Sequence, residues 1–232
     1  MGGQRASGRP VRRGVRLLGA LLVAAGLVVA GRLAWQMWGT DLQVMREQAR
    51  AVEQLESSFA SAPRSDSGAG SGSTHRRAAG GPFAVIRIPA FGADYARPVY
   101  EGTDAPQLAK GIGYVPATAQ PGQIGNFVTA GHRVTYGKPY NRIHELRPGD
   151  RIVVETDEGT YTYGFVSFRI TTAADLGVLA PVPDKVGVVP TEQTGQWITL
   201  IACHPHFSAR ERYVAFARLA EFTPRAVGVP ST

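Results

Sequence analysis

The second half of this 232-residue chain predicts a β-rich domain, either an antiparallel barrel or a sandwich. From Phe83 onward the sequence contains short apolar runs typical of strands, namely FAVIRIP, IGNFVTAGH, RIVVET, TYTYGFVSFRI, WITLIAC and RYVAFARL. Turn-forming stretches such as RPGD and DEGT separate them, which argues against alternating strand and helix units. One short helix is expected within DAPQLAKGIGYVP, before a loop.

Length and charge narrow the function classes. The chain can hold one sizeable domain plus appendages, because domains usually run about 100 to 200 residues. The formal net charge is +7, but the six arginines before Asp41 account for six of these charges and leave +1 for the remainder. No basic patch interleaved with aromatic residues is present, which argues against nucleic-acid binding.

The N-terminal part predicts a membrane anchor. Residues 1–16 form a basic tail, and Leu17 to Gly31 is an uncharged apolar run. Extending this run over residues 17–38 gives about 33 Å of helix, enough for a hydrocarbon core roughly 30 Å thick. The preceding arginines predict a cytoplasmic N-terminus and a single-pass protein of the cell membrane, extracellular from about Gly39 onward. A signal peptide cleaved after Ala30 is the alternative.

Residues 39–81 are expected to connect this anchor to the folded domain. Asp41 to Glu56 has apolar residues at spacings of three and four, which indicates a helix. We interpret it as a juxtamembrane stalk, with a weakly self-associating helix as the alternative. Residues 57–82 are rich in Ser, Gly, Ala and Pro and predict a flexible tether. The domain is then expected at 82–223, followed by a tail at 224–232.

The only cysteine, Cys203, ends the strand-like run WITLIAC and is followed by His-Pro. A single cysteine in an exported chain forms no internal disulfide. One interpretation is an inert buried thiol that packs as a small apolar residue. The other is a nucleophile, because a strand end where the chain turns suits the edge of an active site.

A nucleophilic thiol needs a proton-transfer group and a cation nearby. His132 follows the strand-like run GNFVTAG, and Arg212 lies at the start of the strand after the cysteine. Arg210 is an alternative to Arg212, because residues two apart share one face of a strand. We interpret Arg133, beside the histidine, as a surface charge.

Three segments in this order resemble the sortase family of membrane-anchored cysteine transpeptidases, most closely its class E members from high-GC Gram-positive bacteria. They are TAGHRVTYGKPYNRIHELRPGD, TLIACHP and FSARERYVAFARL, within roughly residues 82–222. The resemblance implies the eight-stranded sortase β-barrel. It also implies Cys203 as nucleophile, His132 as general acid and base, and Arg212 as the group that holds substrate and stabilises the oxyanion.

Two further positions would contact substrate by the same resemblance, and both depart from the family pattern. Sortases usually carry Thr immediately before the nucleophile, whereas this chain has Ala202. Tyr114 lies in GIGYVPAT, where class E members often read closer to G-H-Y-P-G-T. A lost hydroxyl removes one hydrogen bond to substrate or backbone, which alters rate or specificity without abolishing thiol chemistry.

The implied reaction cleaves the Thr–Gly bond of an LAXTG-like C-terminal sorting signal through a thioacyl intermediate. The implied partners are secreted proteins with such signals and, as acceptor, an amine of a peptidoglycan precursor or stem peptide. The alternatives are a pilus-assembling or class D-like sortase and a catalytically inert sortase-like binding domain. No cofactor is implied, and a zinc site at Cys203, His204 and His206 lacks a second pair of ligands.

Overall fold

The computed structural model describes three stretches of the chain, residues 9–34, 40–61 and 80–225. They fall into two compact units that divide after Leu42. The first unit contains helix α1 (Arg9–Ala34). Within the described stretches, no helix is both long enough and apolar enough to cross a membrane. The last part of the predicted anchor and most of the predicted C-terminal tail lie outside the described residues.

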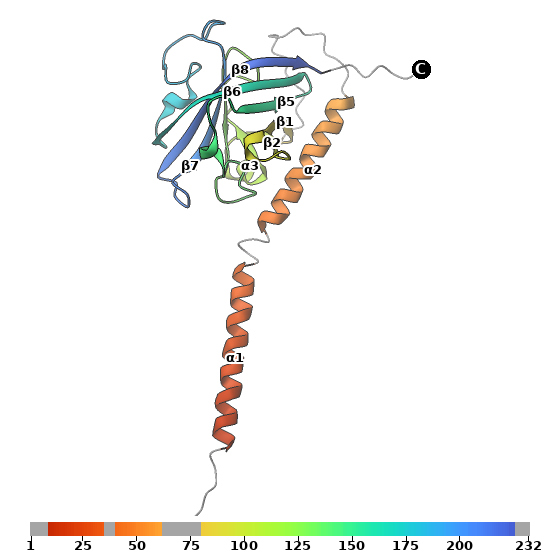
Figure 1. Ribbon diagram of the computed structural model, residues 1–232, viewed down its shortest axis with the longest axis vertical. Helices are drawn as coiled ribbons and strands as arrows, with labels where there is room; N and C mark the ends of the chain where they lie inside the picture. The colour runs from red at the N-terminus through yellow and green to blue at the C-terminus, as the bar shows by residue number, and fades with distance from the viewer. Residues whose placement is uncertain (1–8, 35–39, 62–79, 226–232) are drawn as a thin grey trace, which may run out of the picture. The chain divides into compact units, whose positions relative to one another are not determined.

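Eight strands of the second unit close into a barrel (Figure 1). The order around the barrel is β1-β2-β3-β4-β7-β8-β6-β5. The predicted β-rich domain and the eight-stranded barrel are therefore confirmed. The strands are β1 (Pro82–Arg87), β2 (Ala96–Glu101), β3 (Ile112–Tyr114), β4 (Gly125–Ala130), β5 (Arg151–Glu155), β6 (Gly159–Thr172), β7 (Gln196–His204) and β8 (Glu211–Pro224).

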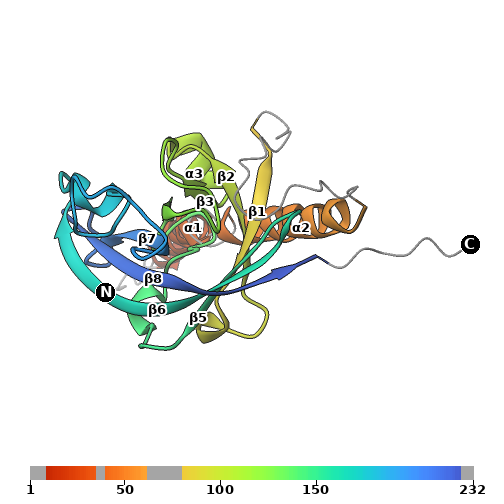
Figure 2. The ribbon, with the colours of Figure 1, turned by 90° about the horizontal axis from the view of Figure 1, so that it is seen from above.

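Short helices occupy several connections between the strands. The expected helix in DAPQLAKGIGYVP is α3 (Ala105–Lys110), which has a proline in its first turn, where a missing N–H is tolerated. Three 3-10 turns complete the described elements: η2 (Pro89–Phe91), η3 (Ile143–Glu145) and η4 (Leu176–Leu179). Figure 2 shows β6 and β8 as the two longest strands, side by side around the barrel.

Strand alternation separates the barrel interior from its outer face. In β7, Ile198, Leu200 and Ala202 belong to the main core cluster. Ile201 instead packs with an outer cluster. Because successive side chains of a strand point to opposite faces, Cys203 lies on the outer face with Ile201.

The sequence predicted an antiparallel arrangement, but the barrel also contains parallel pairs of strands. β2 pairs parallel with β3, and β4 pairs parallel with β7. Parallel neighbours need a long connection between them, and β5 and β6 supply it between β4 and β7. The short strands and turns predicted a β-rich domain but carried no information about this pairing of distant strands.

Helix α2 (Thr40–Ser61) packs on the outer face of β1 (Figure 2). Its buried side chains Val52, Leu55 and Phe59 form one cluster with Val85. The predicted helix is therefore confirmed but extends into the predicted tether. It is also docked on the barrel, unlike the free stalk that its narrow apolar stripe suggested. The rest of the tether, residues 62–79, lies outside the described residues.

We predict that Leu55→Ala lowers the free energy of unfolding by about 2 kcal/mol, because it removes a buried side chain between α2 and β1. Urea unfolding of the full-length chain measures this change. Gln54→Ala is the matched control, because Gln54 is exposed on the same helix and its loss should cost less than about 0.5 kcal/mol. Equal effects of the two substitutions would show that α2 does not contribute to barrel stability.

Candidate active site

Cys203 and Arg212 lie opposite each other on neighbouring strands. Their Cα atoms are direct partners in the antiparallel pair of β7 and β8. Side chains in such a pair share one face, with Cβ atoms about 4.5 to 5.5 Å apart. Arg210 precedes β8 and is exposed. Strand register therefore brings Arg212, and not Arg210, beside the thiol.

The parallel pairing of β4 and β7 brings His132 to the other side of Cys203. Ala130 is the register partner of Ile201, and the backbone N–H of Gly131 donates to the Ile201 carbonyl at 3.0 Å. His132 and Cys203 each follow their paired residue by two positions. Cys203 lies within β7, whereas His132 lies two residues beyond the end of β4, so the parallel pairing brings both residues to the same edge of the barrel.

The His132 side chain is half-buried and lies against an aromatic ring. Its ring centroid is 4.9 Å from that of Tyr136, with an interplanar angle of 37°. The Tyr140 backbone N–H donates to the His132 carbonyl at 3.0 Å, which holds the backbone at this position. Burial lowers the pKa of the His132 imidazole, because desolvation disfavours its charged form. The neutral imidazole is therefore the main form at neutral pH and can accept a proton.

Arg133 is not the surface charge that the sequence suggested. It is 4% exposed, and its Nη1 donates to the Cys203 carbonyl at 3.3 Å. The same nitrogen lies 2.9 Å from Nδ1 of His204. Because a guanidinium only donates, this contact makes Nδ1 the acceptor and leaves the His204 proton on Nε2. The local sequence could not reveal this burial, which arises because β7 lies beside the end of β4.

The guanidinium of Arg133 also lies over the ring of Tyr213, with its Cζ 5.8 Å from the centroid. Tyr213 is an interior residue of β8. Arg133 therefore links the ends of β4, β7 and β8 beneath the three candidate catalytic side chains. Burial lowers the pKa of its guanidinium, but the group remains charged at neutral pH.

The Arg212 guanidinium is hydrogen-bonded to the backbone at the start of β8. Its Nη1 donates to the carbonyls of Ala209 and Glu211 at 2.9 and 3.0 Å. These two hydrogen bonds from one nitrogen orient the planar group. A guanidinium has five N–H donors, so the other nitrogens can donate to a further acceptor. This arrangement suits a group that presents donors to a carbonyl oxygen on the Cys203 face.

The two predicted substrate-contacting residues lie in the barrel core. Ala202 is 2% exposed and faces the interior, on the opposite side of β7 from Cys203. Tyr114 is also 2% exposed, and its hydroxyl donates to the Thr118 carbonyl and accepts from Nε2 of Gln120. Their contact with substrate stays a prediction.

The zinc alternative finds no geometric support in the described part of the chain. No group of three or more His, Cys, Asp or Glu side chains there could hold a metal ion. Nδ1 of His204 instead contacts Arg133, and Nε2 of His206 lies 3.3 Å from the Asn141 amide nitrogen. The proximity in sequence of Cys203, His204 and His206 does not become a ligand cluster.

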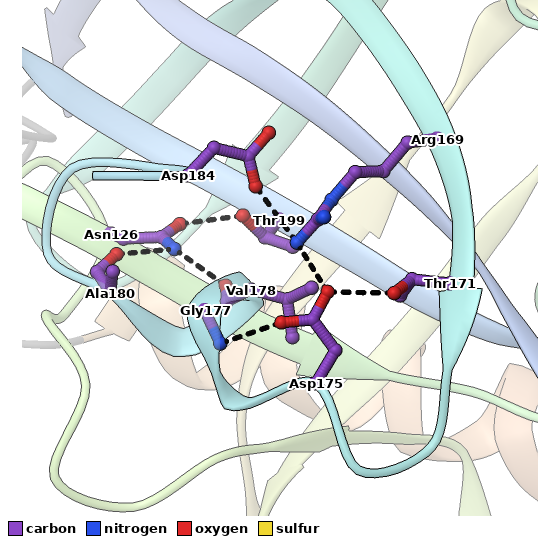
Figure 3. Close-up of polar contacts among 9 residues, drawn as sticks. All are labelled: Asn126, Arg169, Thr171, Asp175, Gly177, Val178, Ala180, Asp184 and Thr199. Atoms are coloured by element: carbon purple, nitrogen blue, oxygen red, sulfur yellow. Dashed lines mark hydrogen bonds and ion pairs between the residues drawn. The ribbon is translucent and has the colours of Figure 1, made fainter. Parts of the chain in front are cut away.

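The connection from β6 to β7 is anchored beside this outer face (Figure 3). The Asn126 side chain of β4 donates to the Val178 and Ala180 carbonyls at 3.1 and 3.0 Å, and it accepts from Thr199 of β7 at 2.8 Å. Val178 also packs in the outer cluster with the partly buried Ile201. These contacts fix the connection over the strand that carries Cys203.

A second set of polar contacts holds the same connection to β6. Arg169 forms ion pairs with Asp175 and Asp184 at 2.7 and 2.8 Å (Figure 3). Asp175 also accepts from Thr171 and from the backbone N–H of Gly177, which caps η4. Sequence inspection did not identify this network, because its members are ordinary surface residue types separated by loops.

A thiol, an imidazole and a guanidinium at one end of a closed barrel define a site for cysteine-dependent acyl transfer. The sortase domain family matches residues 86–220 of this chain. The curated Sortase SrtE1 of Streptomyces coelicolor is 31% identical over 223 residues, which cover 93% of this chain and 60% of that protein. The chain thus spans less than two thirds of the length of Sortase SrtE1. Sortase SrtE2 from the same organism is 30% identical, and the match covers 86% of that protein.

Solved structures agree with these matches. Sortase E from Streptomyces avermitilis superposes with a TM-score of 0.55 at 38% identity, over 62% of this chain and 90% of that one. Sortase E1 from Streptomyces coelicolor, solved with a tripeptide in its active site, has a TM-score of 0.57 at 34% identity, over 64% and 94% of the two chains. The chain belongs to the sortase family, whose members are cysteine transpeptidases.

We predict that Arg133→Ala lowers the free energy of unfolding by about 2 kcal/mol, because it removes a buried side chain and leaves the half-buried Cys203 carbonyl and His204 ring without this donor. Urea unfolding of the full-length chain tests this. Arg210→Ala removes the same side chain from an exposed position and should change stability by less than about 0.5 kcal/mol. A similar small effect at both positions would contradict the linking role of Arg133.

Stability should fall as the pH drops from about 7.5 to 5.5. Burial lowers the pKa of both His132 and His206 in the folded chain, and the charge of Arg133 adds to this effect at His206. The unfolded chain then binds more protons than the folded one just below the unfolded histidine pKa of about 6.5, so acidification favours unfolding. Urea unfolding at several pH values should show this slope, and His132→Gln should make it shallower. A flat profile in this window would refute the burial argument.

Proposed function

We propose that this chain is a membrane-anchored transpeptidase that cleaves a C-terminal sorting signal and transfers the protein to an amino group of the cell wall. The observation that carries the proposal is the register of three strands, which gathers His132, Cys203 and Arg212 at one edge of the barrel. Family membership supports the reaction class.

The first half-reaction forms a thioester. Sγ of Cys203 attacks the threonine carbonyl carbon, and the bond from that carbon to the glycine nitrogen breaks. As Sγ attacks, the neutral His132 imidazole accepts the thiol proton and then donates it to the departing amine. In the second half-reaction the incoming amine attacks the thioester and gives a proton to the imidazole, which passes it to the departing sulfur of Cys203 and so restores the thiol. The position of His132 beside Cys203 suits both transfers.

Arg212 stabilises the negative charge that develops on the carbonyl oxygen. The support for this role is the register of β7 and β8, which sets Arg212 opposite Cys203 on the neighbouring strand. A lysine at this position carries the charge but not the planar set of donors. Arg212→Lys is therefore expected to reduce kcat strongly.

The LAXTG-like signal rests on the resemblance to class E members, and the similarity to proteins named Sortase SrtE1 and sortase E is in line with that class. Ala202 replaces the threonine usual in the family and is buried in the core. Its methyl group supplies no hydrogen bond, so an effect of this replacement on signal preference arises from the lost hydroxyl or from the packing of the core at this position.

The proposed location is the cell membrane, with the N-terminus in the cytoplasm and the barrel outside. The support is the uncharged run Leu17 to Gly31 behind five arginines. Described apolar side chains of α1 such as Leu21 and Val28 are exposed, at 68% and 70%. An aqueous environment would leave this apolar surface without a partner.

Cleavage of a quenched fluorescent LAXTG peptide by the full-length chain tests the proposed reaction. Hydroxylamine in the assay should trap the acyl group as a hydroxamate, which mass spectrometry identifies. Cys203→Ala should abolish cleavage, and Arg212→Lys should lower kcat by about 100-fold, in the range for loss of an oxyanion donor. Arg210→Lys serves as the matched control and should retain activity.

Three results would redirect the proposal. A folded chain that cleaves neither LAXTG nor LPXTG peptides, even with added amine, would favour an inert binding domain. Transfer to a pilin lysine in preference to a peptidoglycan stem peptide would favour a pilus-assembling enzyme. Cleavage that persists in Cys203→Ala would exclude the thiol mechanism.

A further inference from the structure

Helix α2 contacts the loop that carries the candidate general acid and base. Gln48 of α2 is 1% exposed, although glutamine is usually a surface residue. Its Nε2 donates to the backbone carbonyl of Tyr136 at 3.1 Å, across 88 positions of sequence. Gln48 therefore crosses from the N-terminal helix to the loop between β4 and β5.

The loop segment that Gln48 contacts has an uncommon backbone conformation. Tyr136, Gly137 and Lys138 have positive φ angles of 52°, 74° and 52°. The left-handed conformation is uncommon for residues other than glycine and needs support from its surroundings. A Cβ at position 137 would lie 3.0 Å from Oε1 of Gln48, so the amide packs directly against the glycine.

The same loop residue touches the catalytic imidazole. The carbonyl of Tyr136 accepts from Gln48, and the ring of Tyr136 lies 4.9 Å from the His132 ring. Tyr136 is 45% exposed, so the protein interior does not confine its ring on all sides. The conformation of its backbone thus decides where the ring meets the imidazole.

Gln48 is itself held by the docking of α2. Val52 and Leu55, one and two turns further along the helix, are buried against Val85 of β1. Glu56 forms an ion pair with Arg87 of the same strand. Apolar packing and this ion pair therefore fix the height and rotation of α2, and with them the position of the Gln48 amide.

We propose that Gln48 is a positioning residue for transpeptidation, which holds Tyr136 so that its ring orients the His132 imidazole toward Cys203. The inference rests on the proposed function and assigns α2 a part in it. A displacement of about 1 Å in a reacting group can cost about 100-fold in rate, so a modest shift of Tyr136 is enough to affect proton transfer. The expected signature is a lower kcat with a nearly unchanged KM.

Gln48→Met tests this role with little change in volume. Methionine keeps the length of the side chain and removes the donor to Tyr136. It also removes Oε1, a buried oxygen with no hydrogen-bond partner among the described residues, so the net cost in stability should be small. We expect a three- to tenfold fall in kcat for peptide cleavage by the full-length chain, with KM within twofold of wild type.

Two reference variants separate positioning from stability. Val154→Ala removes buried side-chain volume from the barrel interior, away from α2, and should lower the unfolding midpoint while kcat, measured well below that midpoint, stays unchanged. Tyr136→Ala removes the ring on His132. In this background Gln48→Met should have no further effect on kcat, because residues that act through one contact are not additive. Equal losses of kcat in Val154→Ala and Gln48→Met, or full additivity with Tyr136→Ala, would overturn the proposal.

Nuclear magnetic resonance of histidine-labelled protein supplies a readout independent of activity. The Tyr136 ring shifts the imidazole proton signals of His132 through its ring current, and Gln48→Met should move them toward their values in Tyr136→Ala. His132→Gln assigns the signal. If wild type does not cleave the peptide, the proposed function fails while this shift still tests the contact. An unchanged His132 signal in Gln48→Met would refute the positioning role.

Discussion

The parallel pairing of β4 and β7 is the constraint on which the site depends. Parallel strands bring their C-terminal ends to one edge, so His132 and Cys203 lie at the same edge of the barrel although they are 71 positions apart in sequence. An antiparallel pairing of the same strands would place these residues at opposite ends of the barrel. β8 then reverses direction and starts at the shared edge, which brings Arg212 into register with the thiol.

The edge that carries the three side chains is supported from within and from outside. Arg133 binds the Cys203 carbonyl from beneath and lies over Tyr213, so the ends of three strands share one buried cation. On the outer face, Asn126 ties the β6 to β7 connection to β4 and β7. Reactive groups work best when their neighbours restrict their movement, and both networks provide that restriction here.

Helix α2 extends this support to the N-terminal part of the chain. Its apolar residues determine that it docks on β1, while the buried Gln48 determines what it touches at the other end. The two kinds of contact have different consequences. Apolar packing tolerates small shifts of the helix, whereas a hydrogen bond to one carbonyl depends on distance and angle. A segment expected to be a simple spacer thereby becomes part of the surroundings of His132.

Local sequence patterns determined the β-rich class, the strand-like runs that correspond to six of the eight strands, and the candidate roles of Cys203 and His132. They missed β2, which contains a proline, and β3, which has only three residues and contains a glycine, because these residue types are depleted in strands. The resemblance already favoured Arg212, and tertiary structure added the strand register that sets Arg212, and not Arg210, opposite Cys203 and placed Arg133 in the interior. The physical reason is that periodicity along a strand reports which face is buried, whereas the register between distant strands depends on the packing of the whole barrel.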